Sequence, residues 1–281
     1  MNVTDSFEKR VDALRKALKD AEYVVIGAGA GLSAAAGLEY GGERFRKNFP
    51  DFIEKYNLRD MYSATFYPFR TEEERWAYLS RHILLNRFDN GSAVPLYKEL
   101  LRSVIGKEYF VITTNVDALF EKAGFAPERI FSVQGDYGFL QCGRGCHETL
   151  YPDEAIVREV VQRTENCRIP SELVPRCPVC GGKMEVHIRK DEYFIEDSAW
   201  SESLERYRSF MEKAMPGRTL LLEIGVGFNT PSIIRFPFER IASQHSNVTL
   251  VRVNRDYPEA QLAIPSFIPF SENLYGSALF K

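Results

Sequence analysis

Apolar stretches long enough to cross a membrane are absent from this sequence of 281 residues. A spanning helix needs about 20 consecutive apolar residues, and the charged N-terminal stretch 1–20 also lacks the apolar segment of a secretory signal. The formal net charge of −3 gives no electrostatic reason to expect a nucleic acid or an anionic membrane surface as a partner. These absences predict a soluble, cytoplasmic protein that binds neither nucleic acid nor membrane.

Cysteine is scarce as well. Five cysteines are too few for a secreted disulfide scaffold, and four of them form two close pairs, Cys142 with Cys146 and Cys177 with Cys180. This spacing is typical of tetrahedral zinc sites, and four thiolates leave no open position on the metal. We therefore predict a structural zinc site, with a redox dithiol or two disulfides as the alternatives. Cys167, between the pairs, is expected to be a spare thiol.

Glycine is concentrated in one stretch, Tyr23–Gly37, with the sequence YVVIGAGAGLSAAAG. The apolar run Tyr23–Ile26 is typical of a buried strand, and Gly27, Gly29 and Gly31 follow it ahead of an alanine-rich helix start. Such a turn places backbone N–H groups against a phosphate, and glycine allows the ligand to approach closely. The spacing is not that of the specific GxGxxG or GxxxxGK motifs, so a tight turn packed under the helix remains an alternative.

Four further strand-like runs end in polar or glycine-rich turns. They cover residues 109–112, 131–133, 220–224 and 248–253. Open parallel sheets bind ligands at the carboxyl ends of their strands. Asn115 and Asp117 lie just past one such end, although they could instead cap the helix that follows. The alternation of strands with helical segments predicts an α/β fold with a doubly wound, Rossmann-like parallel sheet and one crevice at the strand ends.

The expected domain organisation is one main domain with two inserts. Residues 1–140 and 186–281 are expected to form the Rossmann-like domain, including a helical insert at about 45–105. Residues 141–185 bracket the paired cysteines and are expected to form the small zinc-binding module.

In this order, the segments resemble the sirtuin family across essentially the whole chain. Gly29–Ser33 with Gly37 resembles the family's GAGIS…G phosphate loop. Thr113–Asp117 resembles TQNID, whose Asn contacts the nicotinamide ribose and whose Asp holds the carboxamide. The paired cysteines match the zinc module, and Ile188-Arg189 matches the return segment. Three later turns match cofactor-binding loops, namely Gly225-Val226-Gly227, Asn254-Arg255 and Gly276-Ser277-Ala278.

The resemblance implies NAD as co-substrate and zinc as the bound metal. It assigns NAD contacts to Gly29, Ala30, Gly31, Ser33, Phe45, Asn115, Asp117, Gln134, Gly225, Gly227, Asn229, Asn254, Arg255, Ser277 and Ala278.

Two departures separate the chain from sirtuin deacylases. Deacylases have a histidine as general base in a His-Gly pair at the end of the third strand, and here the pair is Gln134-Gly135. Glutamine does not titrate near neutral pH, and general base catalysis commonly contributes ~10²–10⁴-fold. The return segment His187–Glu192 is also charged where deacylases have an apolar lane for acyl-lysine. Both changes resemble the macrodomain-linked class M sirtuins, which are protein ADP-ribosyltransferases.

The resemblance therefore implies an enzyme that cleaves the nicotinamide–ribose bond of NAD and passes ADP-ribose to a protein. Asn115, Gln134 and Arg189 are the expected catalytic residues: they would position the ribose, hydrogen-bond its hydroxyls, and hold the acceptor's carboxylate or acidic surface. Phe45 would shield the vacated nicotinamide site from water. The resemblance further implies a lipoylated glycine-cleavage-H-like carrier as acceptor and a macrodomain hydrolase acting on the product. A lysine deacylase, an NAD glycohydrolase and a non-catalytic NAD sensor remain the alternatives.

Overall fold

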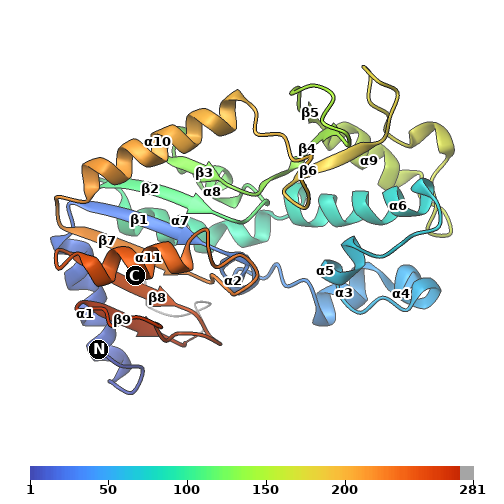
Figure 1. Cartoon of the computed structure of the whole chain (residues 1–281). Coiled ribbons are helices and arrows are strands. Elements are labelled where there is room, and N and C mark those ends of the chain that lie inside the picture. Colours follow the sequence, from blue (N-terminus) through green and yellow to red (C-terminus); the bar gives the residue numbers. More distant parts are fainter. Residues whose placement is uncertain (273–281) are drawn as a thin grey trace.

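A six-stranded parallel sheet forms the centre of the larger lobe of this computed structural model, which describes residues 1–272 (Figure 1). The strand order is β3-β2-β1-β7-β8-β9, and every neighbouring pair is parallel. The strands are β1 (Tyr23–Ala28), β2 (Glu108–Thr113), β3 (Ile130–Ser132), β7 (Thr219–Ile224), β8 (Val248–Val253) and β9 (Phe267–Phe270). The chain winds outward from β1 and from β7, which confirms the predicted doubly wound sheet and puts the switch point between these two strands.

The edge strand β9 is the one member of this sheet that the sequence pattern does not predict. It has four residues and contains Pro269, and its one partner in the sheet is β8. Proline removes a ladder hydrogen bond and is therefore confined to edges, so this short segment lacks the usual signature of a strand.

Helices cover both faces of the sheet (Figure 1). One face packs against α1 (Phe7–Asp20), α2 (Ala30–Ala35), α7 (Val94–Val104) and α8 (Leu119–Ala123), and the other against α10 (Ser198–Ala214) and α11 (Arg235–Gln244). Along β1, Val24 and Ile26 belong to the first core and Val25 to the second, because successive strand residues face opposite sides. Burial on both faces explains why the strand appears in the sequence as a continuous apolar run.

A smaller lobe lies beside the main sheet (Figure 1). It contains an antiparallel sheet of order β5-β4-β6 and five helices. The elements are α3 (Gly42–Asn48), α4 (Pro50–Tyr56), α5 (Met61–Thr65), α6 (Glu72–Ile83), β4 (Gly135–Cys142), β5 (Tyr151–Pro152), α9 (Glu154–Gln162) and β6 (Met184–Ile188). One hydrophobic core joins side chains of α3–α6 to those of the cysteine module. The helical and cysteine inserts therefore pack together as one lobe, whereas α7 packs on the main sheet.

Short helical turns complete the connections. They are the π-helix η1 (Leu84–Phe88) and the 3₁₀ turns η2 (Gly91–Ala93), η3 (Pro127–Arg129) and η4 (Ser171–Leu173). Two of the longer helices begin at side-chain caps, since Ser6 Oγ accepts from the Lys9 N–H and Thr71 Oγ1 from the Glu74 N–H. Within residues 1–272, no helix combines the length and the apolar character that crossing a membrane requires.

Candidate functional site

The glycine turn after β1 packs directly against the turn after β7, at the switch point of the sheet. The Gly29 N–H donates to the Ile224 carbonyl at 3.0 Å, and the Gly31 N–H donates to the Gly225 carbonyl at 2.9 Å. A Cβ added at Gly31 would lie 2.6 Å from the Gly225 Cα, and one added at Gly29 would lie 2.7 Å from the Gly225 carbonyl oxygen. Both glycines are thus needed for the two turns to approach each other, while Ala30 between them is exposed.

Three of the expected site residues meet in one buried hydrogen-bonded cluster beside this turn. The Ser33 hydroxyl donates to Asp117 Oδ2 at 2.5 Å, and Asn115 Nδ2 lies 3.1 Å from both Ser33 Oγ and the Gly29 carbonyl oxygen. Asp117 Oδ1 accepts from the Leu119 N–H at 3.1 Å, so the carboxylate pairs with the first N–H group of α8, although the N-cap position itself is Ala118. Burial raises the pKa of Asp117, although the Ser33 hydrogen bond opposes the shift.

Tyr97 completes this cluster, and the sequence does not single it out. Its hydroxyl lies 2.9 Å from Ser33 Oγ and 3.4 Å from Asn115 Nδ2. The residue belongs to the buried stripe of α7 together with Leu96 and Leu100. A tyrosine in such a stripe is indistinguishable from a packing residue until the fold brings α7 over the glycine turn.

Gln134 lies in a segment hydrogen-bonded to the one that carries Asn115. The Val133 N–H donates to the Thr113 carbonyl and the Tyr137 N–H to the Val116 carbonyl, each at 3.0 Å. Gln134 Oε1 is buried and has no hydrogen-bond partner within the part of the chain that the structure describes. A buried acceptor without a donor suits a ligand hydroxyl, because leaving it unpaired is unfavourable.

Arg189 lies next to Gln134 through the backbone, since its N–H donates to the Gln134 carbonyl at 2.9 Å. Its guanidinium lies 4.3 Å from the ring centre of Phe194 and 5.4 Å from that of Trp200, and it pairs with Glu196 at 2.5 Å. The guanidinium is therefore oriented by its own loop while its side chain stays 35% exposed. It can meet an acidic group arriving from solvent.

A second polar network, which the sequence does not reveal, joins the segment that carries Asp117 to the one that carries Gln134 through Arg87 of η1. Asn90 Nδ2 donates to the Asp117 carbonyl at 2.9 Å, and Lys122 Nζ donates to Asn90 Oδ1 at 2.6 Å and to the Arg87 carbonyl at 2.5 Å. The Arg87 side chain in turn donates to Asp136 at 2.6 and 3.1 Å. Since Asp136 is two residues beyond Gln134, the network ties the positions of the two segments together.

Phe45, expected near the nicotinamide, lies in α3 within the core of the smaller lobe. Its ring centre is 5.4 Å from that of Phe49, and 1% of the residue is exposed. The structure does not bring Phe45 into the hydrogen-bonded cluster around Asp117. Its role at the nicotinamide site stays a prediction.

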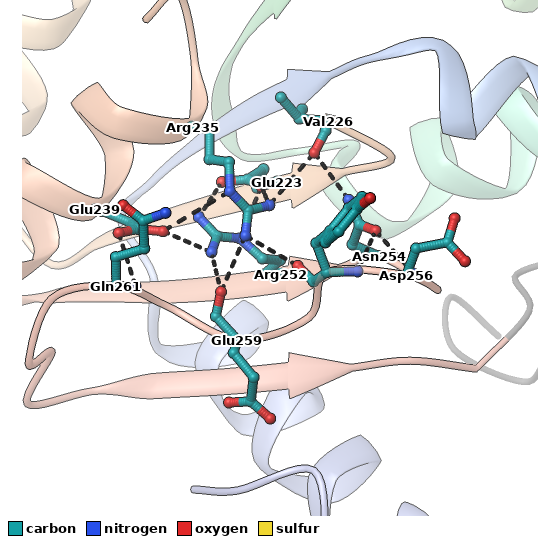
Figure 2. Close-up of polar contacts among 10 residues, drawn as sticks. Glu223, Val226, Arg235, Glu239, Arg252, Asn254, Asp256, Glu259 and Gln261 are labelled. Carbon is teal, nitrogen blue, oxygen red and sulfur yellow. Dashed lines mark hydrogen bonds and ion pairs between the residues drawn. The ribbon is translucent and has the colours of Figure 1, made fainter. Parts of the chain in front are cut away.

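The NAD contacts expected in the second half of the sheet lie on the turns after β7 and β8, of which Figure 2 shows Asn254. Asn254 Nδ2 donates to the Val226 carbonyl at 2.8 Å, and Asn254 Oδ1 accepts from the Asp256 and Tyr257 N–H groups at 3.1 and 3.0 Å. Asn254 thus joins the two turns. The Arg255 side chain is 75% exposed and pairs with Asp256.

The other NAD contacts expected on these turns are Gly225, Gly227 and Asn229. Gly225 has φ +64°, and Gly227 has open space around it. Asn229 is exposed. Ser277 and Ala278 lie outside the described residues, so their assignment stays a prediction.

Four cysteine sulfurs converge in the smaller lobe. Cys142 Sγ lies 3.7 Å from Cys180 Sγ, Cys146 Sγ lies 3.7 Å from Cys177 Sγ, and all four sulfurs are within 4.8 Å of one another. Tetrahedral zinc with Zn–S bonds of about 2.3 Å separates its sulfurs by about 3.8 Å, so the cluster fits a closed zinc site.

The fifth cysteine is not part of this set. Burial raises the pKa of Cys167 to about 11, which keeps this thiol protonated and unreactive at neutral pH.

Comparison with known proteins identifies the family. The model of the Sir2 family matches residues 29–215, and the chain belongs to this family, the sirtuins. A protein ADP-ribosyltransferase from Staphylococcus aureus is 40% identical over 252 residues, which cover 89% of this chain and 80% of that protein. A probable bifunctional ADP-ribose hydrolase/ADP-ribosyltransferase from Fusarium oxysporum f. sp. cubense is 34% identical over 260 residues, covering 88% of this chain and 42% of that protein.

A solved structure supports the fold independently. The crystal structure of a complex between a Sir2 homologue and NAD aligns with a TM-score of 0.60 and 18% identity, covering 98% of this chain and 91% of that chain. At this identity the likeness concerns the fold, and it agrees with the doubly wound sheet described above.

Proposed function

We propose that this protein is an NAD-dependent protein ADP-ribosyltransferase. The observation that carries the proposal is Gln134, a residue that does not titrate, at the position where sirtuin deacylases have their general base. Its side-chain oxygen is buried and has no hydrogen-bond partner among residues 1–272, which suits a hydrogen bond from a ribose hydroxyl. The relatives from Staphylococcus aureus and Fusarium oxysporum, both named as ADP-ribosyltransferases, support the same activity.

The reaction breaks the bond between the ribose carbon and the nicotinamide nitrogen of NAD, and nicotinamide leaves with the bonding electron pair. A nucleophilic atom of the acceptor forms the new bond to the same carbon and releases its proton to solvent. Asp117 orients the carboxamide, and Asn115 positions the ribose. Cleavage builds positive charge on the sugar. The buried hydrogen bonds among Ser33, Asn115 and Asp117 are already formed without substrate, so the cluster is preorganised for this step. Arg189 holds an acidic group of the acceptor.

The turns at the switch point would bind the pyrophosphate and the adenosine half of NAD. We propose that Gly29, Ala30, Gly31 and Ser33 contact the pyrophosphate and that Gly225, Gly227, Asn229, Asn254 and Arg255 contact the adenosine half. Ser277 and Ala278, which lie outside the described residues, are proposed as further contacts of NAD. Phe45 shields the vacated nicotinamide site, which requires it to leave its buried place in α3. Zinc, held by the four cysteines, has a structural role only.

The proposed acceptor is a carrier protein of the lipoylated glycine-cleavage-H type, modified in the cytoplasm. A macrodomain hydrolase that removes ADP-ribose from the product is the proposed second partner. The Fusarium oxysporum relative, which is named for both a hydrolase and a transferase activity and of which this chain covers 42%, supports such a pairing.

The test is incubation with radiolabelled NAD and candidate carriers, lipoylated and unlipoylated, with an acyl-lysine peptide in parallel. We expect label on the carrier, no deacylation of the peptide, and loss of labelling in Asn115→Ala. Efficient deacylation without protein label would make the protein a deacylase. Free ADP-ribose as the main product would make it a glycohydrolase, and NAD binding without turnover would make it a sensor.

A further inference from the structure

Four charged side chains are buried together behind the turns that follow β7 and β8 (Figure 2). Arg252 on β8 forms a bidentate pair with Glu223 on β7, with N–O distances of 2.7 and 2.8 Å, and donates to Glu239 of α11 at 2.7 Å. Each of these three residues is at most 2% exposed. They join two strands and a helix below the predicted crevice, and all three side chains are buried. Arg252 also donates to the Glu259 carbonyl at 2.7 Å.

The fourth member, Arg235, makes more of its contacts with backbone carbonyls. Its Nη1 lies 3.4 Å from the Val226 carbonyl oxygen and 3.4 Å from Glu223 Oε1, and its Nη2 donates to the Tyr257 and Glu259 carbonyls, each at 3.0 Å. Most hydrogen bonds of Arg235 therefore go to backbone carbonyls in two loops (Figure 2).

The two loops held by Arg235 flank the adenosine side of the proposed NAD site. The first carries Gly225 and Gly227, and the second follows directly on Asn254 and Arg255. The Phe228 ring of the first loop lies 4.5 Å above the Arg235 guanidinium and 5.0 Å from the ring of Tyr257 in the second loop. The ring contacts of Phe228 and the hydrogen bonds of Arg235 to the backbone thus both hold the two loops together around the Arg235 guanidinium.

We infer that Arg235 is a positioning residue that sets the affinity of the enzyme for the adenosine half of NAD without acting on the reacting bond. This inference rests on the NAD-binding part of the proposed function. A planar guanidinium presents several donors in a fixed fork and can serve both loops at once. A lysine ammonium is a single point charge, so it can neutralise Glu223 but cannot hold Val226, Tyr257 and Glu259 together.

The test compares Arg235→Lys and Arg235→Met with the wild-type protein. Arg240→Met is the matched control, because Arg240 is an exposed arginine on the same helix. Binding of NAD and of ADP-ribose is measured by calorimetry, KM and kcat by transfer of label, and inhibition by free nicotinamide separately. Losing hydrogen bonds from a charged donor should weaken binding of NAD and ADP-ribose by about ten-fold in Arg235→Lys.

A positioning role predicts that kcat and nicotinamide inhibition change less than about two-fold in Arg235→Lys. Arg235→Met leaves Glu223 with one partner fewer and should lose more affinity than Arg235→Lys. Unchanged NAD affinity in a folded Arg235→Lys protein, or a fall in kcat at constant KM, would overturn the inference. Failure of the wild-type protein to label any acceptor while it still binds NAD would instead count against the transferase proposal alone.

Discussion

The two halves of the predicted crevice differ in how their buried charged groups are held. On the β1–β2–β3 side, the buried carboxyl of Asp117 is held by neutral donors, namely the Ser33 hydroxyl and a backbone N–H. On the β7–β8 side, Arg252 and its carboxylate partners are paired with each other beneath the turns. In the proposed function, the first half carries the side chains nearest the reacting bond. In the second half the buried charges hold the backbone of the loops, since Arg235 and Arg252 both donate to loop carbonyls, and we expect them to take no part in the reaction.

The larger and the smaller lobe also differ in whether their buried carboxylates have partners. Arg252, Glu223 and Glu239 form direct ion pairs. Asp153, in the smaller lobe, is fully buried, and neither carboxylate oxygen has a hydrogen-bond partner within residues 1–272. Burial, reinforced by the nearby Asp136 carboxylate, raises the pKa of Asp153 to about 8. Removing a charge should therefore have opposite effects on stability at the two places.

The largest effect is expected from Arg252→Met. Removing Arg252 leaves two buried carboxylates, Glu223 and Glu239, with Arg235 as their shared and more distant partner at 3.4 and 4.0 Å, and breaking a buried pair destabilises by about 3–5 kcal/mol. Urea unfolding measures the loss directly, and Arg240→Met on the exposed face of α11 should stay within about 0.5 kcal/mol of wild type.

The double variant Arg252→Met/Glu223→Met distinguishes unpaired charge from lost packing. It removes both charges and leaves Arg235 paired with Glu239 at 4.0 Å, so much of the stability should return. A double variant as unstable as the single one would mean that packing around Arg252, and not its charge, holds this half together.

Asn115→Ala should have the next largest effect, this time on rate. Removal of one preorganised donor at a reacting centre typically lowers kcat by about 10²–10³. Labelling assays with saturating NAD measure this fall. Asn247→Ala is the control, because the Asn247 side-chain amide likewise donates to backbone carbonyls, those of Met215 and Gly217, but at the amino end of β7 and β8. Comparable loss of rate in the two variants would show that Asn115 acts through stability and not at the reaction centre.

Asp153→Asn should stabilise the protein at high pH. A carboxyl with a raised folded-state pKa takes up a proton on folding, so its contribution to stability falls as pH rises from about 4 to about 8. Asparagine does not titrate, so the variant should match wild type near pH 4 and exceed it at pH 8 by on the order of 2 kcal/mol. Thermal unfolding across this range measures the difference, with the exposed Asp12→Asn as control. A difference that does not vary with pH would contradict this assignment.

The same contrast explains what the sequence could predict. The sequence singles out a candidate residue when the motif is contained in one short segment. The glycine turn, Asn115 with Asp117, and the paired cysteines are such motifs. The strand pattern predicted five of the six strands of the main sheet because parallel strands buried on both faces are continuous apolar runs.

The rest of the site depends on contacts between distant segments. Glu223 and Arg252 are 29 positions apart on neighbouring strands, and each is one charged residue in an otherwise apolar run. Tyr97 reaches Ser33 across 64 positions. Asp153 acquires its raised pKa from burial against β4, which depends on tertiary packing. No local pattern marks such residues, since their chemistry is set by what the fold places around them.

The smallest effect is expected from Arg87→Met, which tests whether the β1–β2–β3 side also has a positioning charge. Arg87 in η1 holds Asp136 through two hydrogen bonds and is linked through Lys122 and Asn90 to Asp117. Loss of this partly exposed pair should displace Gln134 slightly, and kcat should fall by about ten-fold, equivalent to about 1.4 kcal/mol, at constant KM for NAD. Arg87→Lys keeps one charged contact and should recover part of the rate.

Arg158→Met is the matched control for Arg87, because Arg158 forms exposed ion pairs with Asp89 and Glu154 nearby. Exposed pairs contribute little, so its kcat should remain at the wild-type value. The contrast with Arg235 then becomes quantitative: a positioning arginine on the reacting side changes kcat, and one on the adenosine side changes KM. If Arg87→Met changed KM and left kcat unaltered, the two halves of the crevice would not be separable in function, and η1 would belong to NAD binding.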